Sequence, residues 1–128
     1  MGHSGMVVDT NIFIEYLRTK DKTQSILSKI PSDIDLYVTS ISLYELLMGA
    51  TSEKKLKDVE LLTEDLIILP FDKEASMEAG KIFQDLRTNN KIIEFRDIFI
   101  GAICKTNFLP LKTLNKKHFT RIKGLKLA

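Results

Sequence analysis

Short apolar runs rich in β-branched residues recur along the chain and predict the strands of a sheet. The first of them, Met6-Val7-Val8, is followed at once by polar residues, and Pro70 closes the third. Pro110 lies inside the fourth run, which is typical of a strand end or a sheet edge. We expect strands at residues 6–8, 36–39, 66–69, 108–111 and 125–127.

Between these runs the apolar residues recur at helical spacing, as Ala75, Ala79, Ile82 and Leu86 do. Residues that favour helix ends mark several boundaries. Four helices are expected at residues 10–17, 23–30 (before Pro31), 98–104 and 116–121. Three more are defined by their end residues. The first is capped by Ser40 or Ser42 and ends at Gly49, the second is capped by Ser52, and the third, a long helix, is capped by Asp72 and ends at Asn89-Asn90.

Alternating strands and helices predict an α/β fold, with a parallel sheet covered by helices on both faces. The sheet has four to five short strands. No repeat, low-complexity stretch or Gly/Ser linker divides the chain, so we expect a single domain over residues 6–128. Residues 1–5, Met-Gly-His-Ser-Gly, are typical of an expression scar.

Composition narrows the class of protein. The chain has 128 residues, of which 44% are hydrophobic, and this suits one domain with an ordinary core. No apolar run approaches the roughly 20 residues that cross a bilayer, and the N-terminus lacks the pattern of a secretion signal. The single cysteine, Cys104, lies in an apolar run and is expected to be a small buried hydrophobic residue. We therefore expect a soluble protein of the cytoplasm without a membrane partner.

Three carboxylates lie in apolar surroundings. Asp9 follows Val7-Val8, Glu45 lies between Tyr44 and Leu46, and Asp97 precedes a long apolar run. Burying a charge is costly unless a counter-charge accompanies it. Three oxygen ligands without a His or Cys cluster suit Mg²⁺ or Mn²⁺. The simpler alternatives are helix capping for Asp9 and Asp97 and an ion pair with an arginine for Glu45.

Charge is distributed unevenly along the chain. Residues 1–90 hold 10 Lys and Arg against 15 Asp and Glu, whereas residues 91–128 hold 9 against 2. A basic segment attracts a polyanion by releasing its condensed counterions, although a charged run can also be only a solvated surface. Asp97 lies inside the basic segment, which favours the first interpretation.

Four segments resemble motifs of the PIN domain, and specifically of the VapC-type toxin ribonucleases of toxin–antitoxin pairs. They occur in the family's order and extend over most of the chain. They are Val8-Asp9-Thr10-Asn11-Ile12-Phe13, Thr39-Ser40-Ile41-Ser42-Leu43-Tyr44-Glu45-Leu46, Arg96-Asp97-Ile98-Phe99-Ile100-Gly101-Ala102 and Thr113-Leu114-Asn115-Lys116-Lys117-His118-Phe119. The resemblance implies a single three-layer PIN-like domain and Mg²⁺- or Mn²⁺-dependent endoribonuclease activity. It also implies an RNA substrate, homodimers and a cognate antitoxin that blocks the site with an inserted side chain.

The resemblance also assigns roles to individual residues. Asp9, Glu45 and Asp97 correspond to the catalytic, metal-binding acids. Asn115 stands where relatives often have a fourth acid, and His118 stands where many relatives carry one; we expect His118 to be a surface or helix residue. Asn11, Thr113 and Asn115 are expected to support the acids, and Arg96, Lys116 and Lys117 to bind RNA.

Two other classes are compatible with parts of this pattern. Asn115 in place of an acid is compatible with a catalytically silent PIN-like module that binds RNA or protein. An Asp after a first strand also occurs in receiver-like domains, where it is phosphorylated with the help of Mg²⁺. Receivers normally pair two acids near that strand, but here Val7-Val8 precede Asp9, which disfavours this class.

Overall fold

The computed structural model describes residues 4–128. Within them, four parallel strands form one sheet in the order β3-β2-β1-β4. The strands are β1 (Gly5–Val8), β2 (Asp35–Thr39), β3 (Ile67–Leu69) and β4 (Leu111–Lys112). Val7 of the central strand β1 pairs with Tyr37 on one side and with Leu111 on the other. The predicted α/β fold with a parallel sheet is confirmed.

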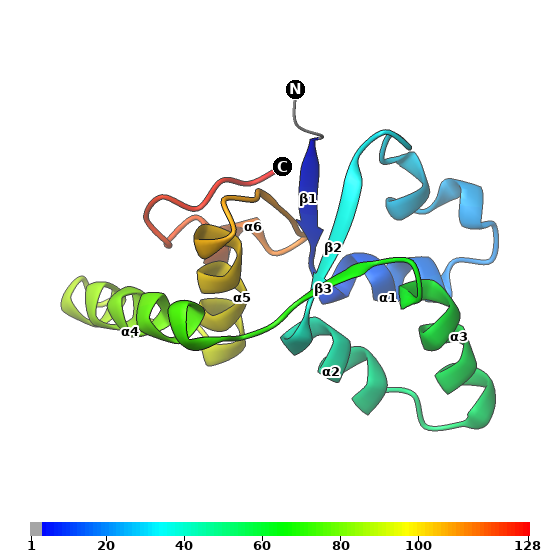
Figure 1. Ribbon diagram of the computed structural model, residues 1–128, viewed down its shortest axis with the longest axis horizontal. Helices are drawn as coiled ribbons and strands as arrows, with labels where there is room; N and C mark the ends of the chain where they lie inside the picture. Colours follow the sequence, from blue (N-terminus) through cyan, green and yellow to red (C-terminus); the bar gives the residue numbers. More distant parts are fainter. Residues whose placement is uncertain (1–3) are drawn as a thin grey trace.

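Helices cover both faces of this sheet, which gives the molecule three layers (Figure 1). α4 and α5 lie on one side of the strands, and α1, α2 and α3 lie on the other. The helices are α1 (Thr10–Arg18), α2 (Ser40–Met48), α3 (Glu53–Thr63), α4 (Lys73–Thr88), α5 (Phe95–Thr106) and α6 (Lys116–Phe119), and two short 3₁₀ turns are η1 (Lys22–Gln24) and η2 (Leu27–Lys29).

Two hydrophobic cores lie on the two faces of the sheet. Side chains of a strand point alternately to opposite faces. Val7 therefore packs with α4 and α5, while its neighbour Val8 packs with Ile12, Phe13 and Leu46 on the other face. α5 is buried over most of its length, as its apolar sequence predicts. Cys104 of this helix is fully buried, and burial, followed by the charge of Asp9, raises the pKa of its thiol.

The helix predicted for residues 23–30 is wrong. Two separate 3₁₀ turns, η1 and η2, occupy this segment. The hydroxyl of Ser25 donates to the carbonyl of Lys22, and the hydroxyl of Ser28 donates to that of Ser25. The backbone N–H of Ile26 donates to the Glu15 carboxylate. Local bonds of this kind compete with a regular helix, and the sequence pattern did not reveal them.

The last two predicted strands are also shorter than expected. β4 begins only at Leu111, because Phe108 has a positive φ of 56° and Pro110 has no N–H to donate. Near the C-terminus, only Leu127 makes a bridge, a parallel one to Leu111. The predicted strands at residues 108–111 and 125–127 are therefore reduced to two residues and a single bridge.

Several helix boundaries agree with the sequence and others differ. Gly49 ends α2 as predicted, whereas α5 covers residues 95–106 rather than 98–104 and α6 covers residues 116–119 rather than 116–121. Ser52 and Asp72 cap α3 and α4, and Asn89 ends α4, as predicted. The cap of α2 is Thr39 rather than Ser40 or Ser42, because the Thr39 hydroxyl accepts from the N–H of Ser42. This leaves the Ser42 side chain free to face α1.

The first strand begins close to the N-terminus of the chain. Residues 1–3 of the expected expression scar lie outside the described residues, while Gly5 already belongs to β1 and the Ser4 carbonyl accepts from the N–H of Asp35. Over residues 4–128, none of the helices has the length and apolar character needed to cross a bilayer.

Candidate active site

The side chains predicted to form the site gather where the parallel strands end. Asp9 follows β1 directly, α2 begins directly after β2, and Thr113 follows β4. The carboxyl ends of parallel strands lie along one edge of a sheet, where α/β proteins usually bind their ligands. The sequence segments around residues 9, 45 and 113 are brought together in this way.

Asp9 acts as a helix cap and as a member of the acid cluster. Its side chain is fully buried. Oδ1 accepts from the backbone N–H of Thr10 at 2.8 Å and from Nη2 of Arg96 at 3.0 Å. Oδ2 accepts from the Thr113 hydroxyl at 2.7 Å. The capping role and the site role are thus carried by one carboxylate.

Glu45 reaches the same place from α2. Its Oε1 accepts from the Thr10 hydroxyl at 2.7 Å and from Nη2 of Arg96 at 2.6 Å, and its Oε2 accepts from Nε of Arg96 at 3.0 Å. Burial alone would raise the pKa of Glu45, but the hydrogen bonds from Arg96 and Thr10 and the charge of Arg96 lower it below its ordinary value. Glu45 is therefore ionised at neutral pH.

Asp97 lies in the first turn of α5 and is only 1% exposed. Its Oδ1 accepts from Nη1 of Arg96 at 2.6 Å, and its Oδ2 lies 3.2 Å from Nδ1 of His118. The first turn of a helix also stabilises an anion through the backbone dipole. All three predicted acids therefore converge at the carboxyl end of the sheet.

Arg96 joins the three carboxylates. Its guanidinium contacts Asp9, Glu45 and Asp97 at 3.0, 2.6 and 2.6 Å, and its side chain is 24% exposed. Burial would lower the pKa of Arg96, but the bonds to Glu45, followed by the charge and bond of Asp9 and the bond of Asp97, raise it above its ordinary value. The arginine partner considered for Glu45 is thus Arg96. The sequence analysis did not predict the contacts of Arg96 with Asp9 and Asp97. The only signal in the sequence was that Arg96 directly precedes Asp97.

The residues predicted to support the acids form a second group around β4 and α6. The N–H of Asn115 donates to the hydroxyl of Thr113 at 3.0 Å, and its Nδ2 lies 3.0 Å from Nδ1 of His118. Asn11 accepts from the N–H of Leu114 at 3.3 Å, which fastens the loop between β4 and α6. His118, expected to be a surface or helix residue, lies in α6 and also contacts Asp97.

The two lysines predicted to bind RNA lie at the start of α6. Lys116 and Lys117 are exposed and follow directly after Asn115. They are therefore close in the chain to the acid cluster without being part of it. Arg96, which was grouped with them, lies instead among the carboxylates.

The chemistry of these side chains fits a hard divalent cation. Three carboxylates, two of them fully or almost fully buried, direct oxygen atoms at one cationic group, and carboxylate oxygens are the usual ligands of Mg²⁺ and Mn²⁺. One guanidinium balances only part of their charge. Among residues 4–128, no three His, Cys, Asp or Glu side chains are arranged as a metal-ligand set, and the Arg96 guanidinium lies among the three carboxylates.

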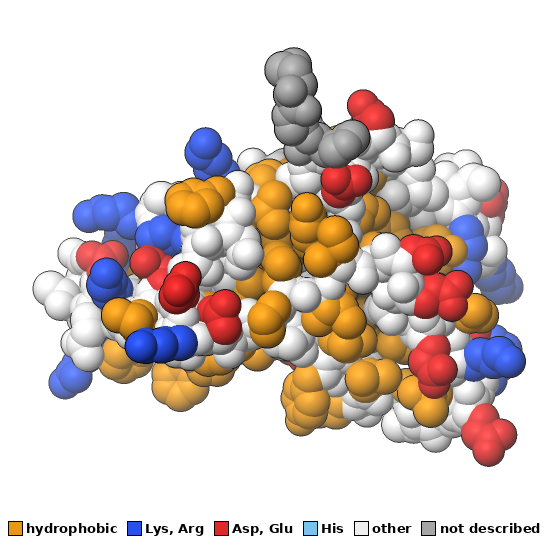
Figure 2. All heavy atoms as spheres, in the orientation of Figure 1, with side chains coloured by type: hydrophobic (Ala, Val, Ile, Leu, Met, Phe, Trp, Pro, Cys, Tyr) orange, Lys and Arg blue, Asp and Glu red, His pale blue; other side chains and the backbone are white. Residues whose placement is uncertain are grey.

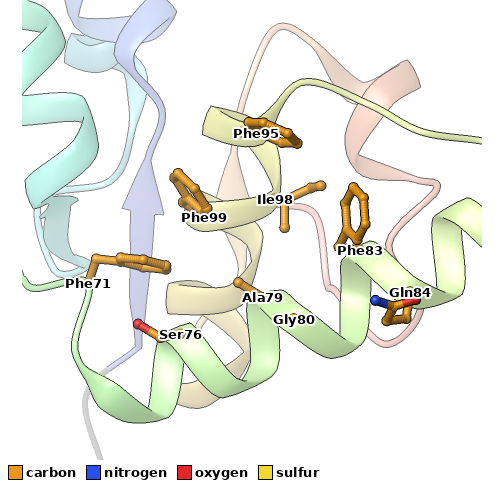
Figure 3. Close-up of a pocket in the computed structure, with 9 residues that line it drawn as sticks. All are labelled: Phe71, Ser76, Ala79, Gly80, Phe83, Gln84, Phe95, Ile98 and Phe99. Atoms are coloured by element: carbon orange, nitrogen blue, oxygen red, sulfur yellow. The ribbon is translucent and has the colours of Figure 1, made fainter.

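A separate apolar groove lies between α4 and α5. Figure 3 shows Phe83 of α4 facing Phe95 and Ile98 of α5, with Phe71 and Phe99 at the end of the groove nearer the sheet. Phe95 and Phe99 also stack on each other, with ring centroids 6.4 Å apart, and Phe95 is 63% exposed. No carboxylate is among the residues that line the groove.

Exposed apolar side chains extend beyond this groove. On the face seen in Figure 2, hydrophobic side chains gather over the middle of the molecule, and charged side chains lie toward its two ends. The larger exposed ones include Tyr44, Met48, Ile67, Ile68, Met77 and Phe95. Exposed hydrophobic patches are typical of interaction surfaces.

Comparison with known proteins identifies the family to which the chain belongs. A parallel α/β sheet with polar groups at the carboxyl ends of its strands is a common setting for a ligand-binding site. The family model of the PIN domain matches residues 6–125, and the chain belongs to this family.

Relatives of nearly the same length are known. A "Ribonuclease VapC" from Rickettsia bellii is 33% identical over 131 residues, covering 96% of this chain and 94% of the relative. "Ribonuclease VapC1" from Methanocaldococcus jannaschii is 27% identical over 126 residues, covering 97% and 87%. Among solved structures, DNA-bound VapBC from Salmonella typhimurium contains a chain that matches with a TM-score of 0.86 at 26% identity, covering 98% of this chain and 97% of that one.

Proposed function

We propose that this chain is a metal-dependent endoribonuclease that hydrolyses RNA phosphodiester bonds and serves as the toxin of a VapBC-type toxin–antitoxin pair. The observation that carries the proposal is the convergence of Asp9, Glu45 and Asp97 at the carboxyl edge of a PIN-domain sheet. Relatives that match almost the whole chain bear the name ribonuclease VapC, and similar solved chains belong to VapBC complexes.

Each acid has a distinct environment and hence a distinct proposed role. Asp9 and Asp97, which are buried, would hold Mg²⁺ or Mn²⁺, and Glu45, with 24% of its side chain exposed, would be a further ligand or accept a hydrogen bond from the attacking water. A divalent cation bound there supplies Lewis acidity and makes water a better nucleophile at neutral pH. Thr113 fixes the orientation of the Asp9 carboxylate through the bond to Oδ2. Asn115 offers a neutral oxygen or amide where a fourth acid would add charge.

The substrate-binding part of the proposal rests on charge. Lys116 and Lys117 are exposed and follow Asn115 in the chain, and the segment from residue 91 onward has a large excess of Lys and Arg. Cations in such positions attract the phosphate backbone of RNA and guide it toward the acids. Arg96 would contribute a further phosphate contact once its guanidinium turns away from the acids.

We extend the proposal to protein partners. The apolar groove between α4 and α5 and the exposed side chains around it support contacts with a cognate antitoxin and with a second copy of the chain. An RNA target and an antitoxin would place this activity in the cytoplasm.

The second candidate is a catalytically silent PIN-like module that binds RNA or protein. Two observations favour it: Asn115 replaces an acid, and Arg96 lies between the remaining carboxylates. The two candidate functions differ in whether the chain cleaves RNA when a divalent cation is present.

The test is an RNA cleavage assay on the purified chain with a structured RNA labelled at both ends. The proposed nuclease produces internal cuts in Mn²⁺ or Mg²⁺ and none in EDTA, and activity returns when Mn²⁺ is restored. Binding of the same RNA without any cut in either metal would favour the silent module.

A further inference from the structure

Arg96 uses all three of its nitrogen atoms on the acid cluster. Nε and Nη2 donate to the two oxygens of Glu45, Nη1 donates to Asp97, and Nη2 also donates to Asp9. The Thr10 hydroxyl, 3.0 Å from Nη2, accepts a further bond. The guanidinium therefore takes the position of a cation that the three acids share.

The contacts of Arg96 involve at least one oxygen of each acid. Oδ1 of Asp9, Oε1 of Glu45 and Oδ1 of Asp97 lie 2.6–3.0 Å from guanidinium nitrogens. Divalent cations of this class bind carboxylate oxygens at about 2.0–2.6 Å, so a cation centred among these three oxygens would occupy the space that the guanidinium fills. Two positive charges at one place would also repel each other strongly in a partly buried site.

We infer that Arg96 is an internal counterion of the acid cluster, and that a divalent cation binds these acids only by displacing its guanidinium. The inference rests on the proposed function to the extent that the cation binds at Asp9, Glu45 and Asp97. Arg96 holds the three carboxylates together without metal and lowers the affinity of the site for metal.

The position of Arg96 in the fold permits this displacement. It lies in the first turn of α5, after the non-helical residues 91–94, and the N-cap Glu94 makes no side-chain hydrogen bond to the helix. A quarter of its side chain is exposed, so the guanidinium can turn outward by rotation about side-chain bonds. The turned guanidinium would face solvent at the mouth of the site, where a phosphate would approach.

The first experiment follows Arg96 directly in the unmodified chain. The sequence contains four arginines, Arg18, Arg87, Arg96 and Arg121. In ¹⁵N-labelled protein, the Nε–H resonances of all four are followed by NMR during a Mg²⁺ titration, with Arg96→Lys identifying the Arg96 signal. The Arg96 resonance should move with the same dissociation constant that calorimetry gives for Mg²⁺, while the other three stay in place. An Arg96 signal that does not move when Mg²⁺ saturates the protein would overturn the inference, as would absence of Mg²⁺ binding.

The second experiment measures Mn²⁺ affinity by electron paramagnetic resonance. Arg96→Gln should bind Mn²⁺ about tenfold more tightly than the parent chain, since a competing charge has been removed. Arg96→Lys should lie between them. Arg87→Gln, which removes an exposed charge at the end of α4, should leave the affinity unchanged. Equal or weaker Mn²⁺ binding by Arg96→Gln would contradict the inference.

These readouts separate the inference from the proposed function. If Mg²⁺ displaces Arg96 but no RNA is cut, the proposed nuclease activity fails and the counterion role stands. If RNA is cut while the Arg96 signal stays in place, the counterion role alone fails.

Discussion

Glu45 and Arg96 lie 51 positions apart and are joined by two hydrogen bonds, from Nε to Oε2 at 3.0 Å and from Nη2 to Oε1 at 2.6 Å. Two planar groups meeting in this way form a stronger and more directional pair than a single contact does. The pair ties α2 to the start of α5 across the carboxyl edge of the sheet. It therefore connects the stability of the fold with the geometry of the proposed active site.

Acid should weaken the fold through Glu45. Its pKa in the folded chain lies below the ordinary value of 4.5, so the ionised form stabilises the native chain above that pH. This contribution is lost as the pH falls through the lower folded-state pKa. Glu45→Gln should therefore lose less unfolding free energy than the parent chain between neutral pH and the range below 4.5. Urea unfolding in EDTA at a series of pH values measures the difference.

The control for that experiment is Glu53→Gln, an exposed residue in the first turn of α3. It should follow the parent chain closely. Identical acid sensitivity in the parent chain and Glu45→Gln would show that the pair with Arg96 does not contribute to stability.

Asp97→Asn should separate the stability of the fold from its response to metal. Two carboxylates remain to pair with Arg96, and the asparagine oxygen can still accept from Nη1. Clustered buried acids also repel one another, so the variant should be as stable as the parent chain in EDTA or more so. It should lose the rise in thermal midpoint that Mn²⁺ gives the parent chain. A large loss of stability in EDTA would instead identify Asp97 as a structural ion-pair partner.

Asn115→Asp should strengthen metal binding. The N–H of Asn115 is anchored on Thr113, and its side chain lies beside His118, which contacts Asp97. Adding a charged oxygen donor to a site of this kind raises its affinity for a hard cation, by about tenfold for a direct ligand. Calorimetry with Mn²⁺ checks this against the parent chain. An unchanged affinity would mean that position 115 lies outside the metal site.

RNA binding should depend steeply on salt. Replacing Lys116 and Lys117 by Gln removes up to about two phosphate contacts and should flatten the plot of log affinity against log salt accordingly. Asp9→Asn protein is used throughout to prevent cleavage. The matched control replaces Lys55 and Lys57, exposed residues of α3, and should keep the original slope. Strong binding that ignores salt would contradict the electrostatic role of the basic segment.

The sequence predicted more of the fold than of the site's internal contacts. Apolar runs were sufficient to predict β1 and β2. β1 is apolar at consecutive positions because both faces of the sheet are covered, and Val7 and Val8 face opposite cores. The buried acids could be predicted because a charged side chain in an apolar run is costly to bury without a counter-charge. Which residue becomes that partner depends on the conformation of the long Arg96 side chain in the folded protein. The contacts of Arg96 with Asp9, which lies 87 positions away, therefore could not be predicted from local pattern.

The cleavage rate of RNA by Asp9→Asn, relative to the parent chain at saturating Mn²⁺, tests the proposed nuclease most directly. The substitution keeps the shape of the side chain and its capping oxygen but removes the charge of a fully buried acid. Asp58→Asn, on α3 and paired with exposed Lys54, controls for loss of a carboxylate. We expect Asp9→Asn to cleave about 100-fold more slowly than the parent chain, or more slowly still, and Asp58→Asn to cleave at an unchanged rate. Equal cleavage by the parent chain and Asp9→Asn would place the activity elsewhere and contradict the account.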